Sequence, residues 1–257
     1  MNQKPVNTID DVILALEKII AESEQNEDVL GYFAALYQRV TIKVKHGIAS
    51  GFFDDGHRME QLDVAFAKRY LEAYQQYREN KAIRESWKRA FNLSDQYWPI
   101  VLQHLLMGIN AHINLDLSIA ATEISHGKNL EDLKNDFNRI NQILSSLVHE
   151  VQDDLSFVWP ALKYILKWTG KVDDYLVDFS MKLARDGAWE FATQLALKPE
   201  NEIEQAIADR DQKVANIDRF IFKTGLIANI ALRLIRITES GSVSGKIQKL
   251  KYKVPFS

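Results

Sequence analysis

The residues best suited to chemistry lie at four-residue intervals between positions 104 and 116. They are His104, His112 and Asp116, and Gly108 fills the remaining place in the series. A helix turns by about 100° per residue, so all four would lie on one face. His112 and Asp116 are one turn apart. They could hold one metal ion together, or the carboxylate could orient the imidazole.

Carboxylates also fall on or beside the apolar faces of three other predicted helices, of which the third, over residues 172–197, carries Glu190. Asp63 lies beside the apolar face of a helix over residues 57–79, with Glu60 at its margin. Asp136 lies within the apolar face of a helix over residues 130–152. Buried carboxylates need a cation, a metal or strong hydrogen-bond donors. Ion pairs with arginines on neighbouring helices are one interpretation, and a shared metal site is the other.

The metal hypothesis brings together carboxylates and an imidazole from three predicted helices. The candidate ligands are Asp63, His112, Asp116 and Asp136. Mixed histidine and carboxylate ligands suit zinc, iron or manganese better than calcium. A metal-bound water would then be the nucleophile of a hydrolase, with His104 or Glu60 transferring protons. Two alternatives stay open, namely a buried hydrogen-bond network that fixes helix register and a metal-free pocket for a small molecule.

The elements that position these residues are predicted to be helices almost throughout. Apolar residues recur at helical spacing, and strict alternation is nearly absent, so we expect an all-α, single-domain bundle of about ten helices over residues 1–257. Their expected ranges are 9–24, 27–45, 57–79, 82–93, 97–123, 130–152, 160–169, 172–197, 200–222 and 225–239. Thr8 and Asp11 have capping-box spacing at the first of them.

Both ends of the chain are expected to lie outside the bundle. Residues 1–7 and 242–257 are interpreted as flexible or extended tails. In the second, apolar residues alternate with lysines, which favours an extended, basic segment. The amino-terminal residues predict neither a secretory signal nor a transit peptide, which favours a cytoplasmic location.

Composition excludes several classes of protein. The chain has 257 residues, of which 46% are hydrophobic and 26% charged, which argues against disorder. Its formal net charge of −3 argues against a nucleic-acid partner, because neutralising a phosphate backbone needs a basic field. The absence of cysteine removes thiolate zinc sites and thiol nucleophiles. Residues 96–115 carry no formal charge, but their Asn, Gln and His side chains argue against a transmembrane segment.

Four segments resemble a bacterial all-helical family catalogued as a domain of unknown function. They are RMEQLDVAFAKRYL at 58–71, WKRAF at 87–91, QHLLMGINAHINLDL at 103–117 and DFNRIN at 136–141. The resemblance implies a soluble helical fold and supplies no activity, substrate or cofactor. The His-x-x-x-Asp spacing also looks like part of the metal-binding pattern of all-helical zinc phospholipases C, which is an analogy at the level of one motif.

These residues leave different classes of function open. The first is a metal-dependent hydrolase with its site in the helical core. The second is a non-catalytic helical module that binds a small molecule or a protein and whose buried polar residues are structural. A third is association with a membrane surface through residues 220–237 and the basic tail.

Overall fold

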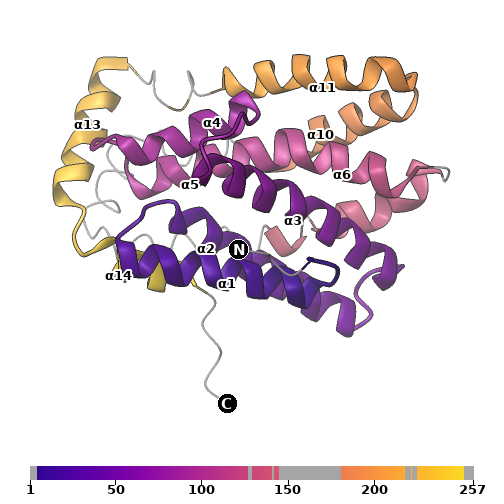
Figure 1. Ribbon diagram of the computed structural model, residues 1–257, viewed down its shortest axis with the longest axis horizontal. Helices are drawn as coiled ribbons and strands as arrows, with labels where there is room; N and C mark the ends of the chain where they lie inside the picture. The colour runs from indigo at the N-terminus through magenta and orange to yellow at the C-terminus, as the bar shows by residue number, and fades with distance from the viewer. Residues whose placement is uncertain are drawn as a thin grey trace.

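The computed structural model describes residues 5–126, 129–140, 142–144, 181–217, 221 and 225–251. These residues form a helical bundle, and no strand occurs among them, so the all-α prediction is confirmed (Figure 1). The α-helices are α1 Ile9–Asn26, α2 Gly31–Ala49, α3 Gly56–Arg78, α4 Glu85–Phe91, α5 Val101–Ala111, α6 Leu117–Ile124, α10 Met181–Ala196, α11 Glu200–Ala215, α13 Gly225–Thr238 and α14 Val243–Leu250. Short 3-10 helices cover Asn92–Asp95 and Leu130–Leu133, and a π-helix covers His112–Asp116.

Side chains at the helix starts explain where several helices begin. Thr8 Oγ1 accepts a hydrogen bond from Asp11 N, and Asp11 Oδ2 accepts one from Thr8 N, both at 3.2 Å. This is the predicted capping box, which satisfies amides that have no partner within the helix. Asp55 Oδ1 accepts a hydrogen bond from Arg58 N at 2.9 Å at the start of α3. Local sequence therefore determines both starts.

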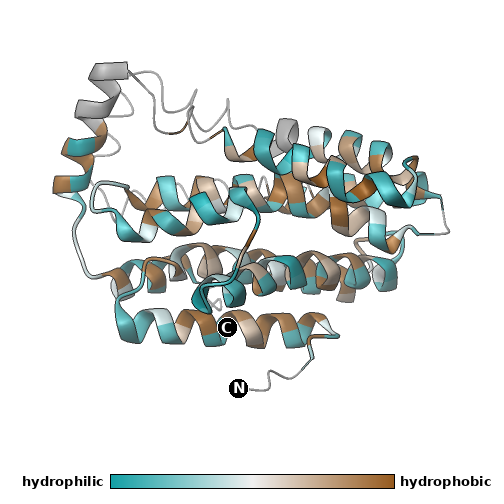
Figure 2. Cartoon of the chain, turned by 45° about the horizontal axis from the view of Figure 1, so that its top comes forward, coloured by the Kyte–Doolittle hydropathy of each residue, from teal (hydrophilic) through white to brown (hydrophobic). Residues whose placement is uncertain are grey.

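An aromatic core joins α2, α3 and α4. Phe33 of α2 makes edge-to-face contacts with Tyr70 of α3 and Trp87 of α4, with ring centroids 5.0 and 5.6 Å apart. Trp87 also stacks on Phe91 at 5.0 Å. Polar and apolar residues alternate around the helix turns (Figure 2), as expected when one side of each helix packs against its neighbours.

Gly108 allows α5 to approach α2 closely. A Cβ atom at this position would lie 2.4 Å from Cδ2 and 2.6 Å from Cγ of Phe33, which is far inside van der Waals contact. The ring of Phe33 is itself buried among other aromatic rings, so it has little room to move. Gly108 therefore makes room for a side chain, the ring of Phe33.

The carboxyl-terminal segment differs from the expected extended tail, because residues 243–250 form helix α14. Ser242 caps this helix by accepting a hydrogen bond from Gly245 N at 3.0 Å. Ile247 and Leu250, spaced for one face of a helix, are buried in the core cluster that α1 and α2 share. Burial of these two side chains outweighs the alternating pattern of the sequence. Figure 1 shows α13 along one side of the bundle and α14 beside α1.

Other helices follow their predicted ranges to within a few residues at most described ends. The range expected as one helix over 97–123 is instead α5, the π-helix and α6 in succession. Residues 134–140 and 142–144 are helical, and they confirm the first part of the helix expected at 130–152. The helix expected at 160–169 lies outside the described residues. So do the end of the helix at 130–152 and the start of the one at 172–197.

Candidate functional site

A π-helix contains the two residues with the strongest sequence signal. It covers His112–Asp116, and its wider turn is closed by a hydrogen bond from Leu117 N to His112 O. Single π-turns inside α-helices are rare and often occur at functional sites. The sequence predicted that His112 and Asp116 lie on one helix face, and the structure joins them directly. The π-turn itself has no signal in the residue spacing.

Asp116 is held by three donors from three separate elements. Its Oδ2 atom accepts hydrogen bonds from Trp87 Nε1 at 2.8 Å and from His112 Nδ1 at 3.0 Å. Its Oδ1 atom accepts one from Arg69 Nε at 3.3 Å. The Asp116 side chain is only 2% exposed. A buried carboxylate with a cation and two further donors has most of its hydrogen-bonding capacity filled.

His112 lies in a cage of aromatic rings with one nitrogen atom free. Its ring stacks on Phe66 at 3.5 Å and meets Tyr37 edge-on at 4.5 Å. Burial lowers the pKa of His112 even though Asp116 raises it, so the imidazole is neutral at pH 7. Because the Asp116 carboxylate is an acceptor, Nδ1 carries the proton and Nε2 is left as an acceptor. Nε2 is buried and has no hydrogen-bond partner among the described residues.

Asp63 is a buried carboxyl group with a raised pKa. Its Oδ2 atom makes no hydrogen bond within the described part of the chain. Burial raises the pKa of Asp63 to about 7, and the charge of Glu60 adds to the increase. The buried hydroxyl groups of Tyr37 and Tyr70 are likewise without partners there. The sequence correctly indicated that Asp63 faces inward, but no arginine pairs with it in the described residues.

Asp136 belongs to a different set of contacts, which fixes the loop before α3. Its Oδ1 atom accepts a hydrogen bond from Asp54 N at 2.6 Å, and Oδ2 accepts from Asp55 N and Arg58 Nη2, both at 3.1 Å. Arg139 Nη1 lies 3.6 Å from Oδ1. The interpretation of Asp136 as a partner of arginines therefore matches the structure. Two loop amides are further partners that the sequence did not reveal.

The two residues expected to transfer protons line different cavities. Glu60 accepts a hydrogen bond from Ile9 N at 3.1 Å and lines an open cavity of about 420 Å³ on the outer side of α3, together with Arg69 and Glu123. His104 lies on α5 and lines another cavity. Within the described ranges, no three histidine, aspartate or glutamate residues are placed to hold a metal ion. The proposed metal therefore stays a prediction.

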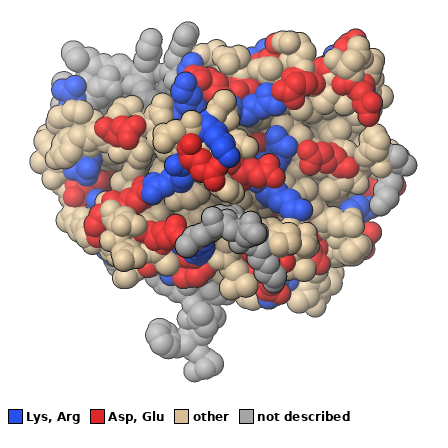
Figure 3. Space-filling model, viewed as in Figure 1, with Lys and Arg blue, Asp and Glu red and all other residues tan. Residues whose placement is uncertain are grey.

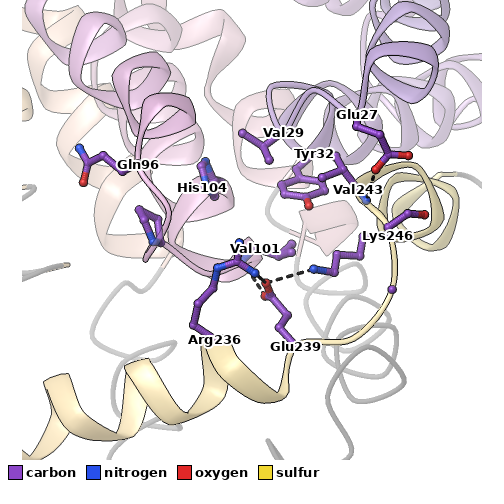
Figure 4. Close-up of a pocket in the computed structure, with 13 residues that line it drawn as sticks. Glu27, Val29, Tyr32, Gln96, Val101, His104, Arg236, Glu239, Val243 and Lys246 are labelled. Carbon is purple, nitrogen blue, oxygen red and sulfur yellow. Dashed lines mark hydrogen bonds and ion pairs between the residues drawn. The ribbon is translucent and has the colours of Figure 1, made fainter.

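The cavity beside His104, hereafter the His104 cavity, has a volume of about 260 Å³ (Figure 4). Its lining residues come from the end of α1, from α2, from the segment around α5, and from α13 and α14. They are Glu27, Val29, Tyr32, Gln96, Pro99, Val101, His104, Arg236, Glu239, Gly241, Ser242, Val243 and Lys246. The cavity is partly open to solvent and combines apolar with charged side chains, as small-molecule sites commonly do.

His104 is one of the buried side chains that line this cavity. It is 8% exposed, and its imidazole makes no hydrogen bond to the described residues. Its ring meets Tyr32 edge-on at 5.8 Å. Burial, followed by the charges of Arg236 and Lys246, lowers the pKa of His104 to about 4. The neutral ring therefore presents one donor and one acceptor.

Glu239 organises the charged wall of the His104 cavity. Its Oε1 atom accepts a hydrogen bond from Val101 N at 3.0 Å. Its Oε2 atom is shared by Arg236 Nη1 at 3.0 Å and Lys246 Nζ at 3.1 Å. The residue spacing did not predict this cluster, because Lys246 lies in the segment that was expected to be a flexible or extended tail. The i,i+3 spacing of Arg236 and Glu239 was the one local signal that could have paired them.

Comparison with known proteins identifies the family of the chain. A model described as a family of unknown function, DUF5995, matches residues 9–224. The chain belongs to this family. The four segments that suggested the resemblance lie within the DUF5995 match, so the resemblance is confirmed, while α13 and α14 follow its last residue. No curated protein and no solved structure matches the chain.

Two surface properties bear on the possible partners. Among the described residues, no helix combines the length and apolar character needed to cross a membrane. Basic and acidic side chains are interspersed over the face drawn in Figure 3, and neither sign forms a continuous field there. That face lacks the one-sided basic surface that binds a phosphate backbone.

Proposed function

We propose that this protein is a helical binding module that accepts a small polar molecule in the His104 cavity. The observation that carries the proposal is the buried His104 imidazole, which lines a cavity of about 260 Å³ and has no partner in the described chain. Neither nitrogen atom of His104 is among the fully buried polar atoms without partners in the described residues, and His104 lines the cavity, so a ligand with a matching hydrogen-bonding group can reach this imidazole.

The contacts of the buried carboxylates support a structural role for the polar core. Asp116 joins α3, α4 and the π-helix, and Asp136 holds the loop before α3. Asp211 of α11 holds the start of α4. Its two oxygen atoms accept hydrogen bonds from Glu85 N at 2.7 Å and from Ser86 N at 2.9 Å. Each carboxylate connects segments far apart in sequence, so these groups contribute to the fold.

A metal-dependent hydrolase is the second candidate, favoured by two buried polar atoms. His112 Nε2 and Asp63 Oδ2 have no hydrogen-bond partner within the described residues, and both are chemically suited to a divalent ion. Catalytic zinc sites typically use three protein ligands. Asp116 could serve as a third ligand only by giving up hydrogen bonds to Trp87, His112 or Arg69. The binding module needs no such rearrangement, and we favour it for that reason.

Replacing the two ring nitrogens of His104 with carbon is expected to abolish ligand binding, because the ligand loses its hydrogen-bonding partner in the cavity. A mixture of small polar compounds is screened by ligand-observed NMR against the wild type, His104→Phe and His57→Phe. His57 is an exposed residue that lines the open cavity on the outer side of α3, so its variant is the matched control. We expect compounds that bind the wild type and His57→Phe to lose binding to His104→Phe, with circular dichroism showing that all three are folded. Unchanged binding to folded His104→Phe would refute the proposal.

A further inference from the structure

We propose that the His104 cavity selects a small monocarboxylate, bound between Lys246, Arg236 and His104. This inference rests on the proposed binding function and names the ligand class of the same site. It follows from the charges, free donors and size of the cavity. Figure 4 shows Arg236, Glu239 and Lys246 on one side of the cavity and His104 and Tyr32 on the other.

The charged wall carries one positive charge more than its own carboxylate balances. Arg236 and Lys246 both contact Oε2 of Glu239, whose other oxygen atom is bonded to Val101 N. The Lys246 side chain is 6% exposed, and Glu239 is its one ion-pair partner among the described residues. Lysine is rarely buried to this extent unless its charge is matched. Two cations that share one carboxylate leave room for one further anion.

Glu27, the other acidic residue of the lining, bonds to the backbone at the start of α14. Its Oε2 atom accepts hydrogen bonds from Val243 N at 2.6 Å and Ser244 N at 3.4 Å. These amides open α14, where the helix dipole places partial positive charge. Glu27 therefore bonds the start of α14 and forms no ion pair with Lys246 or Arg236 in the described chain, so the excess of positive charge is local to the two cations beside Glu239.

Hydrogen-bond donors that are not used by the described residues surround the position where an anion would bind. Lys246 Nζ has three donor hydrogens and one acceptor among the described residues, and Arg236 uses Nε on Tyr97 O and Nη1 on Glu239. Arg236 Nη2, the Tyr32 hydroxyl group and one nitrogen of neutral His104 are further donors. A carboxylate has two oxygen atoms that accept several such bonds, and charge-assisted bonds are the strong ones.

Size and lining limit the rest of the ligand. The volume of about 260 Å³ lies just below the range typical of drug-sized ligand sites. Val29, Pro99 and Val101 supply the apolar part of the wall, against which a short hydrocarbon group would pack. One surplus charge matches a monoanion better than a phosphate dianion. The ligand inferred is therefore a carboxylate with a short apolar group.

The test compares propionate with ligands that differ in charge and with variants of α14. Sodium propionate, propionamide and inorganic phosphate are titrated into the wild-type protein by calorimetry. The variants are Lys246→Met, Lys246→Arg and Lys249→Met, the last replacing an exposed lysine on the same helix. We expect propionate to bind the wild type and Lys249→Met equally. Lys246→Met should weaken binding by about tenfold or more, and Lys246→Arg should largely preserve it.

Three results would overturn the inference. They are propionamide or phosphate binding as tightly as propionate, no measurable propionate binding to the wild type, and equal propionate affinity in folded Lys246→Met and Lys249→Met. Propionamide that binds the wild type but not His104→Phe would leave the binding function standing and refute only the carboxylate. Melting curves of each variant separate a lost ligand from a lost fold.

Discussion

Asp116→Ala is expected to lower the free energy of unfolding by about 3–5 kcal/mol, the cost of removing one partner of a buried charged network. The change leaves Trp87 Nε1 and His112 Nδ1 buried without an acceptor. Arg69 also loses its inner partner and keeps Glu123, whose Oε1 atom lies 3.3 Å from Arg69 Nη1. Urea unfolding measured by circular dichroism gives the value directly.

The matched control for this prediction is Asp132→Ala, which removes a carboxylate from an exposed residue. We expect that variant to lie within about 0.5 kcal/mol of the wild type, as surface substitutions usually do. If Asp116→Ala were no less stable than the control, the hydrogen bonds of Asp116 would contribute nothing to the fold. The structural role assigned to the His112–Asp116 pair would then be wrong.

Asp63→Asn is expected to stabilise the protein at neutral and alkaline pH. The Asp63 carboxyl group has a pKa of about 7 in the folded protein and 3.8 as a free side chain, so the folded state binds its proton more tightly. The protonated Asp63 therefore makes its full contribution to the free energy of unfolding below about pH 4. This contribution falls as the pH rises towards 7, because over that range the unfolded chain has released the proton and the folded protein still holds it. The complete loss is about 4 kcal/mol, and an amide that never ionises avoids it.

The measurement for Asp63 is the difference in stability against urea between Asp63→Asn and the wild type, followed as a function of pH. At pH 8, Asp63→Asn should unfold at a higher urea concentration than the wild type, and near pH 4 the two should converge. The comparison is made between proteins at each pH because His104 acts in the opposite sense. Its lowered pKa makes the folded state less stable as the pH falls from about 6.5 towards 4. Asp63→Asn that is equal to or less stable than the wild type at pH 8 contradicts the prediction.

Local sequence predicted the elements and failed mainly where distant residues decide the structure. Thr8 is predicted correctly as a cap because its partner Asp11 lies three residues away. The inward orientation of Asp63, Asp116 and Asp136 is also predicted, because it follows from the apolar face that each interrupts. Lys246 is misplaced in a tail, since its helix is fixed by the burial of Ile247 and Leu250 against α1 and α2.

The partners of the buried polar residues could not be predicted in the same way. The predicted pair of His112 and Asp116 is local, since the two positions are four apart in the sequence, and it is present. Trp87, by contrast, reaches Asp116 across 29 positions, and Glu239 reaches Val101 across 138. Such contacts depend on how helices pack, and residue spacing within one helix carries no information about them. The His104 cavity was missed for this reason, although His104 itself was singled out.

The metal content of the purified protein distinguishes most directly between a structural and a metal-binding role of the His112–Asp116 pair. Untagged wild type and His112→Asn, purified without chelators, are analysed by plasma mass spectrometry for zinc, iron and manganese. A structural pair predicts that both proteins contain far less than one metal ion per chain. Near-stoichiometric metal in the wild type that disappears in folded His112→Asn would contradict this result and make the metal-dependent hydrolase the leading function.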